Sequence, residues 1–313
     1  MMQKLSSIHG SLLGHLMADA LGSTFEGITP EYLHDQFAGP AEVFERALAR
    51  SSLRYTDDGQ MLLVLAEYLT QNTTIDATSL MHSFTQAYEP WRGYGRGARA
   101  LIEAFRDEAD YEFMAVHLFP GGSLGNGGAM RSSPIGLRFV DNFERIWAEA
   151  KTSAWPTHRH ELGIEGAQLI AAATSLAQTE SSLSAARLSE LLLPLCKTVV
   201  FQKRLKLLAT ITNADEIAQF GNGIEAHESV VTALACFALF PDNYRDAISH
   251  ALWQAGDTDT IGAMTGALVG ARIGPNFAQD LPTEKLEDGQ PFLDYVEDLA
   301  NRLFVASSSP LGT

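Results

Sequence analysis

Hydrophobic residues recur along much of the chain at intervals of three and four positions, the spacing of one face of an α-helix. The pattern is clearest in residues 12–21, 61–69, 169–176 and 230–239. No series of alternating β-branched segments separated by tight turns accompanies it. The pattern therefore predicts an all-α fold, and we expect a compact, single-domain orthogonal helix bundle.

Two of the predicted helices carry small residues at every fourth position. These positions are Gly10, Gly14, Ala18 and Gly22 in the first helix, and Gly262, Gly266 and Gly270 in the second. Glycine inside a helix costs about 1 kcal/mol relative to alanine, so its repeated use on one face indicates that another backbone approaches closely. The same spacing marks helix pairing in membranes, but these segments are too short and too polar for that. We expect a tight bundle with the site at its centre.

Glycine-rich breaks fall at residues 93–97, 121–128 and 221–223, with a shorter one at Gly256. We interpret these breaks as loops. Binding and catalytic residues are often carried on loops that a rigid scaffold positions.

Composition narrows the class of protein. The chain has 313 residues, of which 46% are hydrophobic, and no linker or low-complexity tract divides it. We therefore expect one domain over residues 1–313. The net charge of −16 and the absence of a Lys/Arg cluster argue against a general nucleic-acid binder. Acidity of this kind favours solubility, and some of the carboxylates could instead hold metal.

The sequence also bears on location. The N-terminus lacks the features of a signal peptide, and no run of about 18 apolar residues suggests a membrane span. Cys196 and Cys236 are far apart in apolar surroundings, which favours buried free thiols over a disulfide or a zinc site. We expect a cytoplasmic protein that does not bind membranes.

A first polar cluster, Tyr55-Thr56-Asp57-Asp58-Gly59, immediately precedes the helix predicted to begin near Gln60. Thr56 or Asp57 could cap that helix, because acids and hydroxyls satisfy its free N–H groups. Capping needs only one such residue, however, and adjacent carboxylates repel each other. Two acids and a hydroxyl are also what a hard cation requires. The cluster alone leaves both interpretations open.

A second cluster repeats this chemistry near residue 256. Asp257, Asp259 and Thr260 stand at another predicted helix start. Together the two clusters offer six hard oxygen ligands and no Cys or His, a set that suits Mg²⁺, Mn²⁺ or Ca²⁺ and argues against zinc. Two such clusters could hold a pair of metal ions bridged by carboxylates and a water. The Asp-x-Asp-x-Thr phosphatase signature does not apply, because it should follow an apolar strand near the start of its domain.

The segment from Ser123 to Arg131 contains three glycines that let a backbone approach a ligand closely. Successive N–H groups in such a loop can form a nest for phosphate, although a tight turn between helices is an equal alternative. In the segment 91–97, Arg92 and Arg96 could likewise meet phosphates or simply be exposed solubilising charges.

In combination, these motifs resemble the ADP-ribosylglycohydrolase family, whose members are related to the dinitrogenase reductase-activating glycohydrolase. The resemblance covers nearly the whole chain, in the family's order. It includes Ala18-Asp19-Ala20-Leu21-Gly22-Ser23 with Glu26, Tyr55-Thr56-Asp57-Asp58, Gly125-Asn126-Gly127-Gly128-Ala129-Met130-Arg131, Thr157-His158, Gly221-Asn222-Gly223-Ile224 with Glu228-Ser229-Val230, and Gly256-Asp257-Thr258-Asp259-Thr260-Ile261.

The resemblance implies roles for particular residues. Two Mg²⁺ ions, with Mn²⁺ as the alternative, would be held in a central cleft at helix N-termini. Their ligands would be Thr56, Asp57, Asp58, Asp257, Asp259 and Thr260. Substrate would be bound by Ser123, Gly125, Asn126, Gly127, Gly128 and His158, although a buried, hydrogen-bonded core role is the alternative for His158. The candidate catalytic groups are Glu26, on a mobile flap, Asp57, Asp58 and Asp257.

The implied reaction is hydrolysis of the bond between ADP-ribose and an acceptor, on a modified protein or small molecule, with release of ADP-ribose. Ser123, the Gly221-Asn222-Gly223-Ile224 segment and Glu26 resemble the serine-type, poly(ADP-ribose)-degrading branch. Poly(ADP-ribose), O-acetyl-ADP-ribose and arginine-linked ADP-ribose are alternative substrates, and a silent ADP-ribose-binding module is the alternative function. We expect a monomer. The sequence departs from the family pattern at Gly59, where threonine is usual, and at Ala255, where glycine is usual.

Overall fold

The structure is a computed structural model that describes residues 2–308. Within that range all regular secondary-structure elements are helices. The only β pairing there consists of two isolated bridges, Leu53 with Leu286 and Gly125 with Glu225. The all-α class predicted from the hydrophobic spacing is therefore confirmed.

The α-helices are α1 (Met2–Gly22), α2 (Pro30–Gln36), α3 (Pro40–Leu48), α4 (Asp57–Gln71), α5 (Ala77–Ala87), α6 (Arg96–Arg106), α7 (Tyr111–His117), α8 (Gly127–Met130), α9 (Ser133–Arg138), α10 (Phe143–Ala154), α11 (Glu161–Thr179), α12 (Ala185–Leu192), α13 (Val199–Leu208), α14 (Ala226–Leu239), α15 (Tyr244–Trp253), α16 (Thr258–Ile273) and α17 (Gln290–Ser308). Short 3₁₀ helices are η1 (Pro90–Arg92), η2 (Leu193–Leu195), η3 (Ala214–Phe220), η4 (Pro275–Asp280) and η5 (Thr283–Lys285).

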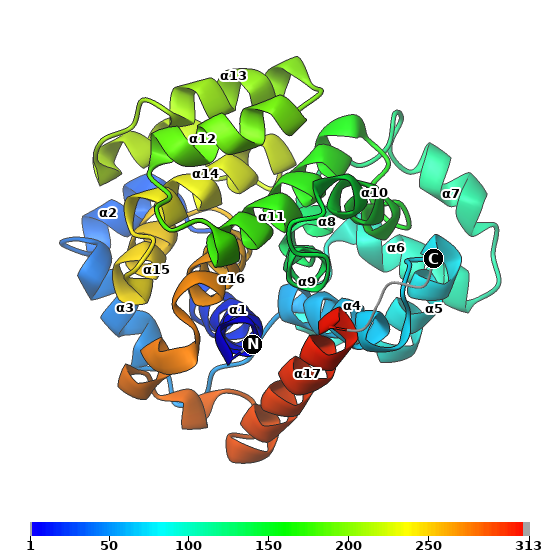
Figure 1. Cartoon of the computed structure of the whole chain (residues 1–313), viewed down its shortest axis with the longest axis horizontal. Coiled ribbons are helices and arrows are strands. Elements are labelled where there is room, and N and C mark those ends of the chain that lie inside the picture. Colours follow the sequence, from blue (N-terminus) through cyan, green and yellow to red (C-terminus); the bar gives the residue numbers. More distant parts are fainter. Residues whose placement is uncertain (1, 309–313) are drawn as a thin grey trace.

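Helices α1 and α16 lie side by side at the centre of the molecule (Figure 1). The small residues of the two stripes face one another. A Cβ atom on Gly14 would overlap the carbonyl oxygen of Gly266, and a Cβ on Gly266 would overlap that of Gly14. Gly10 and Gly270 exclude side chains from each other in the same way. The close backbone approach expected from the stripes is thus confirmed, and each stripe is the other's partner.

This pairing is antiparallel, because Gly10 opposes Gly270 whereas Gly22 opposes the start of α16. The hydroxyl of Thr258 donates a hydrogen bond to the carbonyl oxygen of Gly22 at 2.8 Å, across 236 positions of sequence. The C-terminal end of α1 is therefore held against the N-terminal end of α16. The stripes thereby bring Asp19 next to the second acidic cluster.

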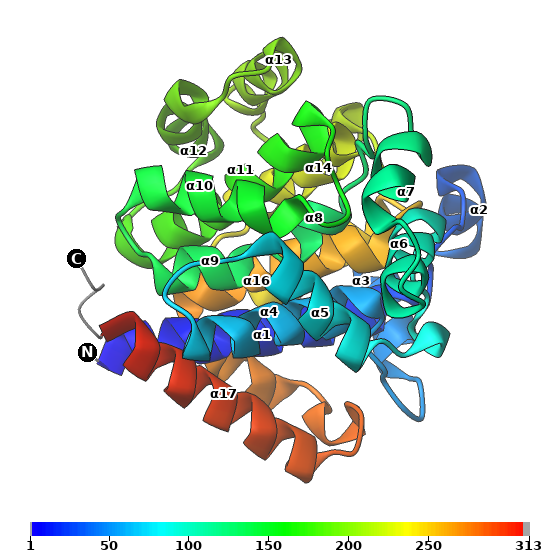
Figure 2. The same ribbon diagram turned by 90° about the vertical axis from the view of Figure 1, so that its right-hand side faces the viewer.

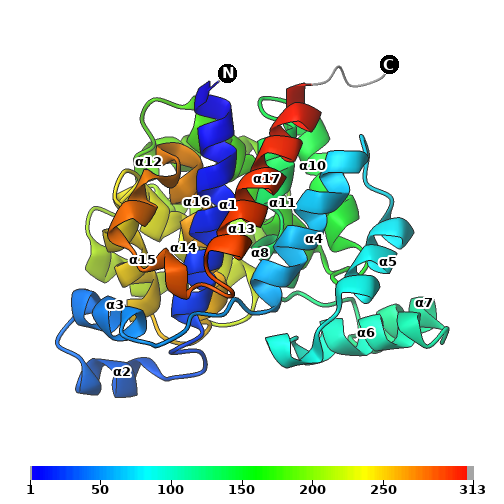
Figure 3. The same cartoon turned by 90° about the horizontal axis from the view of Figure 1, so that it is seen from below.

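The other helices surround this pair. Helices α11, α14 and α15 pack against α16, while α17 lies across α1 and α4 (Figures 1 and 2). Seen from below, α2 and α3 lie on one side of the molecule and α5, α6 and α7 on the other (Figure 3). The four hydrophobic segments identified in the sequence fall in α1, α4, α11 and α14.

Helix α4 begins earlier than the sequence predicted. It starts at Asp57 rather than near Gln60, with Thr56 as its N-cap. The Thr56 hydroxyl oxygen accepts the Asp58 backbone N–H at 3.2 Å, so the cap role falls to the threonine. Both aspartates consequently lie in the first turn of the helix, where the helix dipole favours negative charge.

Two further expectations concern burial and membranes. Cys196 and Cys236 are buried free thiols, as predicted. Among residues 2–308, none of the helices combines the length and the apolar character that crossing a bilayer requires.

Candidate metal and substrate site

A cavity of about 330 Å³ lies where the N-terminal ends of α4 and α16 meet the glycine-rich segments. Most of the residues expected at a functional site line it: Glu26, Asp57, Asp58, Ser123, Gly125, Asn126, Gly127, His158, Asp257, Asp259 and Thr260. Two expected residues do not. Thr56 acts as the cap of α4, and Gly128 packs against Ala154 and Gly163.

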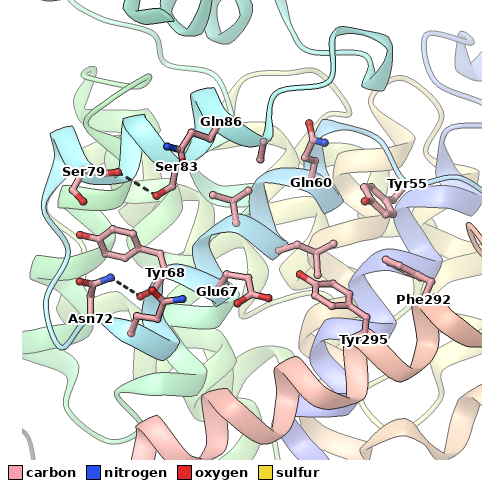
Figure 4. A pocket seen from close by; sticks show the side chains of 14 residues that line it. Tyr55, Gln60, Glu67, Tyr68, Asn72, Ser79, Ser83, Gln86, Phe292 and Tyr295 are labelled. Atoms are coloured by element: carbon pink, nitrogen blue, oxygen red, sulfur yellow. Dashed lines mark hydrogen bonds between the residues drawn. The ribbon is translucent and has the colours of Figure 1, made fainter.

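A larger hollow of about 750 Å³ lies elsewhere, between α4, α5 and α17 (Figure 4). Its lining mixes aromatic side chains such as Tyr55, Tyr68 and Phe292 with amides and hydroxyls. Glu67 is the single carboxylate in that lining, and it is paired with Arg302. Size alone would favour this hollow. The smaller cavity is the better candidate because it concentrates the titratable groups.

The first acidic cluster is held by a residue on another helix. The Asp19 carboxylate, fully buried on α1, accepts the Thr56 N–H at 3.0 Å and the Gly59 N–H at 2.8 Å. These are free amides of the first turn of α4 and its cap. Position 59 is one of the two at which the sequence departs from the family pattern. A Cβ on Gly59 would lie 2.9 Å from Asp19 Oδ2, so the glycine leaves room for the carboxylate.

The second acidic cluster lies at the start of α16. Asp257 is the N-cap residue, and Asp259 and Thr260 follow in the first turn. All three are buried. The Asp257 backbone N–H donates to the carbonyl oxygen of Asn222 at 2.9 Å, so the 221–223 break positions this helix start.

The carboxylates of the two clusters destabilise one another's charge. Burial raises the pKa of Asp57 to about 7, with the neighbouring charge of Glu26 adding to the effect. Burial likewise raises the pKa of Asp257 to about 6, and those of Asp58 and Asp259 well above the ordinary range. After burial, the largest charge effect on Asp58 comes from Asp259. The cleft thus crowds together carboxylates whose ionised forms the described side chains stabilise too little.

This arrangement fits divalent cations. Asp58 Oδ2 is buried and has no hydrogen-bond partner among the described residues. A buried carboxylate oxygen without a partner is costly unless a charge compensates it. The donors are all oxygens, which suits Mg²⁺ or Mn²⁺. The residues present therefore match the group that the sequence predicted.

The glycine loop is tied to the second acidic cluster by Asn126. Its side-chain amide donates to the Ser229 hydroxyl at 2.9 Å and to the Asp257 carboxylate. The Asn126 backbone N–H donates to the carbonyl oxygen of Ile224 at 2.9 Å. The expected loop is only partly a loop, because Gly127 and Gly128 begin the short helix α8.

His158 lies directly beside this loop. A Cβ on Gly125 would lie 3.4 Å from its Nε2 atom, so the ring packs against the loop. Its Nδ1 atom is 2.8 Å from the Thr157 hydroxyl, which also accepts from the buried Arg131 guanidinium at 2.8 Å. Burial, assisted by the charge of Arg131, lowers the pKa of His158 to about 3. The ring is therefore a neutral hydrogen-bonding group that both lines the cavity and is buried.

Glu26 is exposed and lies in the turn that follows α1. Two hydrogen bonds join this turn to the break at Gly256. Gly27 N–H donates to the Gly256 carbonyl oxygen, and Gly256 N–H donates to that of Ile28, each at 2.8 Å. The carboxylate reaches the cleft from its solvent side.

The two arginines of the segment 91–97 have different environments. Arg92 is buried and committed to other partners: its guanidinium donates to Glu287 at 2.7 Å and lies 3.7 Å from the centre of the Tyr55 ring. Neither role considered for Arg92 is correct. Arg96 is exposed and lines the cavity.

The sequence motifs assigned no role to Asp19, although the segment that contains it is part of the family resemblance. A signal was available, since an aspartate within the apolar run from Leu16 to Leu21 is costly to bury unless it is paired. The signal could not name the partner, because the amides that Asp19 accepts lie on α4.

A further acidic group lies nearby. Glu225, His227 and Glu228 are close enough together to share an ion. All three are at least partly exposed, and the Glu228 carboxylate already accepts the Gly223 N–H at 3.1 Å. We assign this group no role.

The fold and the cleft define an all-helical protein with an oxygen-rich site at two helix N-termini, and comparison with known proteins specifies it further. A family model described as ADP-ribosylglycohydrolase matches residues 2–310. The ADP-ribosylhydrolase ARH3 of Homo sapiens is 31% identical over 315 residues, covering 87% of this chain and 86% of that protein. The ADP-ribosylarginine hydrolase Tri1 of Pseudomonas putida (strain GB-1) is 26% identical, covering 96% of this chain and 79% of the relative.

A solved structure described as an ADP-ribosylglycohydrolase-related protein complex has the same fold, with a TM-score of 0.73 and 23% identity. The match covers 98% of this chain and 100% of the chain in the solved structure. The chain belongs to the ADP-ribosylglycohydrolase family, and it is a glycosidase by that membership. The resemblance inferred from the motifs is confirmed.

Proposed function

We propose that this enzyme hydrolyses the glycosidic bond between ADP-ribose and an acceptor side chain. The favoured substrate is a serine side chain linked to ADP-ribose through an O-glycosidic bond. We also propose that residues 1–313 form a single domain. The observation that carries the proposal is the set of buried carboxylates around one cavity, among them the unpartnered Asp58 Oδ2. Such a set suits cations, and bound cations can activate a water for hydrolysis.

Asp57 and Asp58 would hold the cations from α4, and Asp257, Asp259 and Thr260 from α16. Thr56 would join them through the second lone pair of its hydroxyl oxygen, because the first accepts the Asp58 N–H. When bound, a pair of Mg²⁺ ions supplies charge that orients the ribose hydroxyls and makes a nearby water more acidic. Mn²⁺ suits the same oxygen donors.

Side chains of the protein then assist cleavage of the glycosidic bond and the proton transfers that accompany it. A water oxygen forms a bond to the anomeric carbon while the bond from that carbon to the acceptor oxygen breaks, through an oxocarbenium-like transition state. The water loses a proton and the departing oxygen gains one. Glu26 can exchange protons with solvent from its exposed position, whereas Asp57, Asp58 and Asp257 lie deeper. These four are the candidate catalytic groups.

Substrate recognition would fall to the loop from Ser123 and to His158. Asn126 fixes the loop against Asp257, so a ligand held by Ser123, Gly125 and Gly127 is also aligned with the acidic clusters. Gly128 supports the loop through packing. The neutral His158 ring offers a hydrogen bond to ribose without adding charge. Phe119 lines the same cavity and offers an aromatic face for adenine.

The test is incubation of the purified protein with serine-, arginine- and glutamate-linked ADP-ribosyl peptides and with poly(ADP-ribose), in Mg²⁺ and in EDTA. We expect Mg²⁺-dependent release of ADP-ribose, fastest from the serine-linked peptide. Preferential release from the arginine-linked peptide would replace the serine assignment by the activity that the name of Tri1 describes. Tight ADP-ribose binding without release from any substrate, O-acetyl-ADP-ribose included, would show a binding module instead.

A further inference from the structure

The charges that line the cavity are strongly unbalanced. Five carboxylates face it, from Glu26, Asp57, Asp58, Asp257 and Asp259, against two guanidinium groups. A diphosphate is bound more strongly where a positively charged donor meets its phosphates. Cations held by the two acidic clusters would serve the ribose end, and the N–H groups of the loop from Ser123 carry no net charge. A positively charged side chain would therefore add to the binding of the phosphates.

One of the two arginines is not free to be that donor. Arg131 is completely buried, and its guanidinium already donates to the carbonyl oxygens of Gly127 and Ser153 and to the Thr157 hydroxyl. Arg96 has neither an ion pair nor a side-chain hydrogen bond within residues 2–308, and it is exposed. It is the available cation among the described residues that line the cavity.

Arg96 also lies at a suitable place along the cleft. A Cβ on Gly93 would lie 3.9 Å from Asp57 Oδ1, at the acidic end, whereas Gly97 lies directly against the ring of Phe119. Arg96 therefore belongs to a segment that meets the carboxylates at Gly93 and the aromatic side chain at Gly97, and it lines the same cavity as the loop from Ser123.

ADP-ribose has the same order of groups, with a ribose at one end, the diphosphate in the middle and adenine at the other end. We infer that Arg96 binds the diphosphate of ADP-ribose and is a substrate-binding residue of this cleft. The inference rests on the proposed function. The guanidinium presents a fork of donors that matches phosphate oxygens. Nothing lies within 4 Å of a Cβ placed on the neighbouring Gly95, so there is space for the diphosphate on that side.

The test compares the full-length variants Arg96→Gln and Arg99→Gln with the unmodified protein by titration calorimetry in Mg²⁺. Arg99 is the matched control, because it carries the same charge on the same helix but pairs with Glu103 at 3.0 Å. The probes are ADP-ribose and adenosine, which lacks phosphate. We expect Arg96→Gln to weaken ADP-ribose binding roughly tenfold or more, the scale of a charge-assisted hydrogen bond to phosphate. Adenosine binding and the melting temperature should not change.

Added salt should shrink the difference between the unmodified protein and Arg96→Gln, because it screens an exposed charge. Equal ADP-ribose affinity in these two proteins, or an equal loss in both variants, would overturn the inference and leave the proposed function intact. Failure of the unmodified protein to bind ADP-ribose at all would overturn the proposed function itself.

Discussion

The Asp19 carboxylate accepts the backbone N–H of Thr56 at 3.0 Å through each of its two oxygens, so a residue of α1 holds the N-cap residue of α4, which lies 37 positions later in the chain. The same carboxylate accepts the Gly59 N–H at 2.8 Å. Asp19 has no place in the cavity lining and does not belong to the expected ligand set. Its contacts make it a positioning residue for Asp57 and Asp58.

Replacing Asp19 with alanine should therefore affect stability and metal binding together. The Thr56 and Gly59 amides would lose their acceptor, which should lower the free energy of unfolding by about 1–3 kcal/mol. The rise in melting temperature on adding Mg²⁺ should also shrink. Asp76→Ala is the control, because Asp76 caps α5 through the Ser79 N–H, far from the cavity. It should lower stability and leave the Mg²⁺ response unchanged, and the same pattern in Asp19→Ala would contradict the positioning role.

The variant Asp58→Asn should separate the effect of charge repulsion on stability from the effect of metal binding. Removing one charge from the buried cluster relieves repulsion with Asp259, so Asp58→Asn should be at least as stable as the unmodified protein in EDTA. Its stabilisation by Mg²⁺ should nevertheless be largely lost, and turnover should fall by roughly 100-fold or more. Asp257→Asn should behave alike. Thermal unfolding with and without Mg²⁺ measures both effects, and near-normal turnover in either variant would refute the metal site.

The α1–α16 contact should not tolerate a methyl group. A Cβ at Gly266 overlaps the Gly14 carbonyl oxygen, so Gly266→Ala must push two backbones apart and should cost about 1–3 kcal/mol or more. The Mg²⁺ response should weaken too, because Asp19 and Asp259 would be displaced. Gly39→Ala provides the comparison, since nothing lies within 4 Å of a Cβ there. Equal unfolding midpoints for the two variants in a urea titration would show that the contact is looser than described.

The ion pair between Glu67 and Arg302 joins α4 to α17 and should depend on pH. Hydrogen bonds from Arg302 lower the pKa of Glu67 below its ordinary value. The folded protein therefore releases this proton more readily than the unfolded chain. The resulting stability is fully present above the unfolded pKa of about 4.3, and it is lost as the pH falls through the lower folded value.

Glu67→Gln should consequently cost up to about 1 kcal/mol near neutral pH, since the pair is partly exposed and solvent weakens it. Near pH 3 the difference from the unmodified protein should be smaller. Urea unfolding at both values tests this. The control is Glu190→Gln, whose more exposed pair with Arg187 should change little at either pH.

The sequence predicted those features that depend on local spacing. The helical periodicity indicated the fold class, and the glycine stripes indicated a close backbone approach without naming which helix meets which. Two carboxylate clusters at helix starts indicated a common site because their oxygen donors complement each other chemically. Other features depend on tertiary contacts and could not be predicted in this way. Arg92 and Arg96 stand four positions apart in similar surroundings, and only the fold assigns one to Glu287 and the other to the cleft.

The contact between Thr258 and Gly22 also constrains how each molecule is made. Chains are synthesised from the N-terminus, so α1 leaves the ribosome well before α16 exists. Until then its glycines have no opposing backbone and weaken the helix that they interrupt. Asp19 meanwhile has no neighbour from the second acidic cluster. The two acidic clusters can thus come together only after translation has passed α16, when the central helix pair closes.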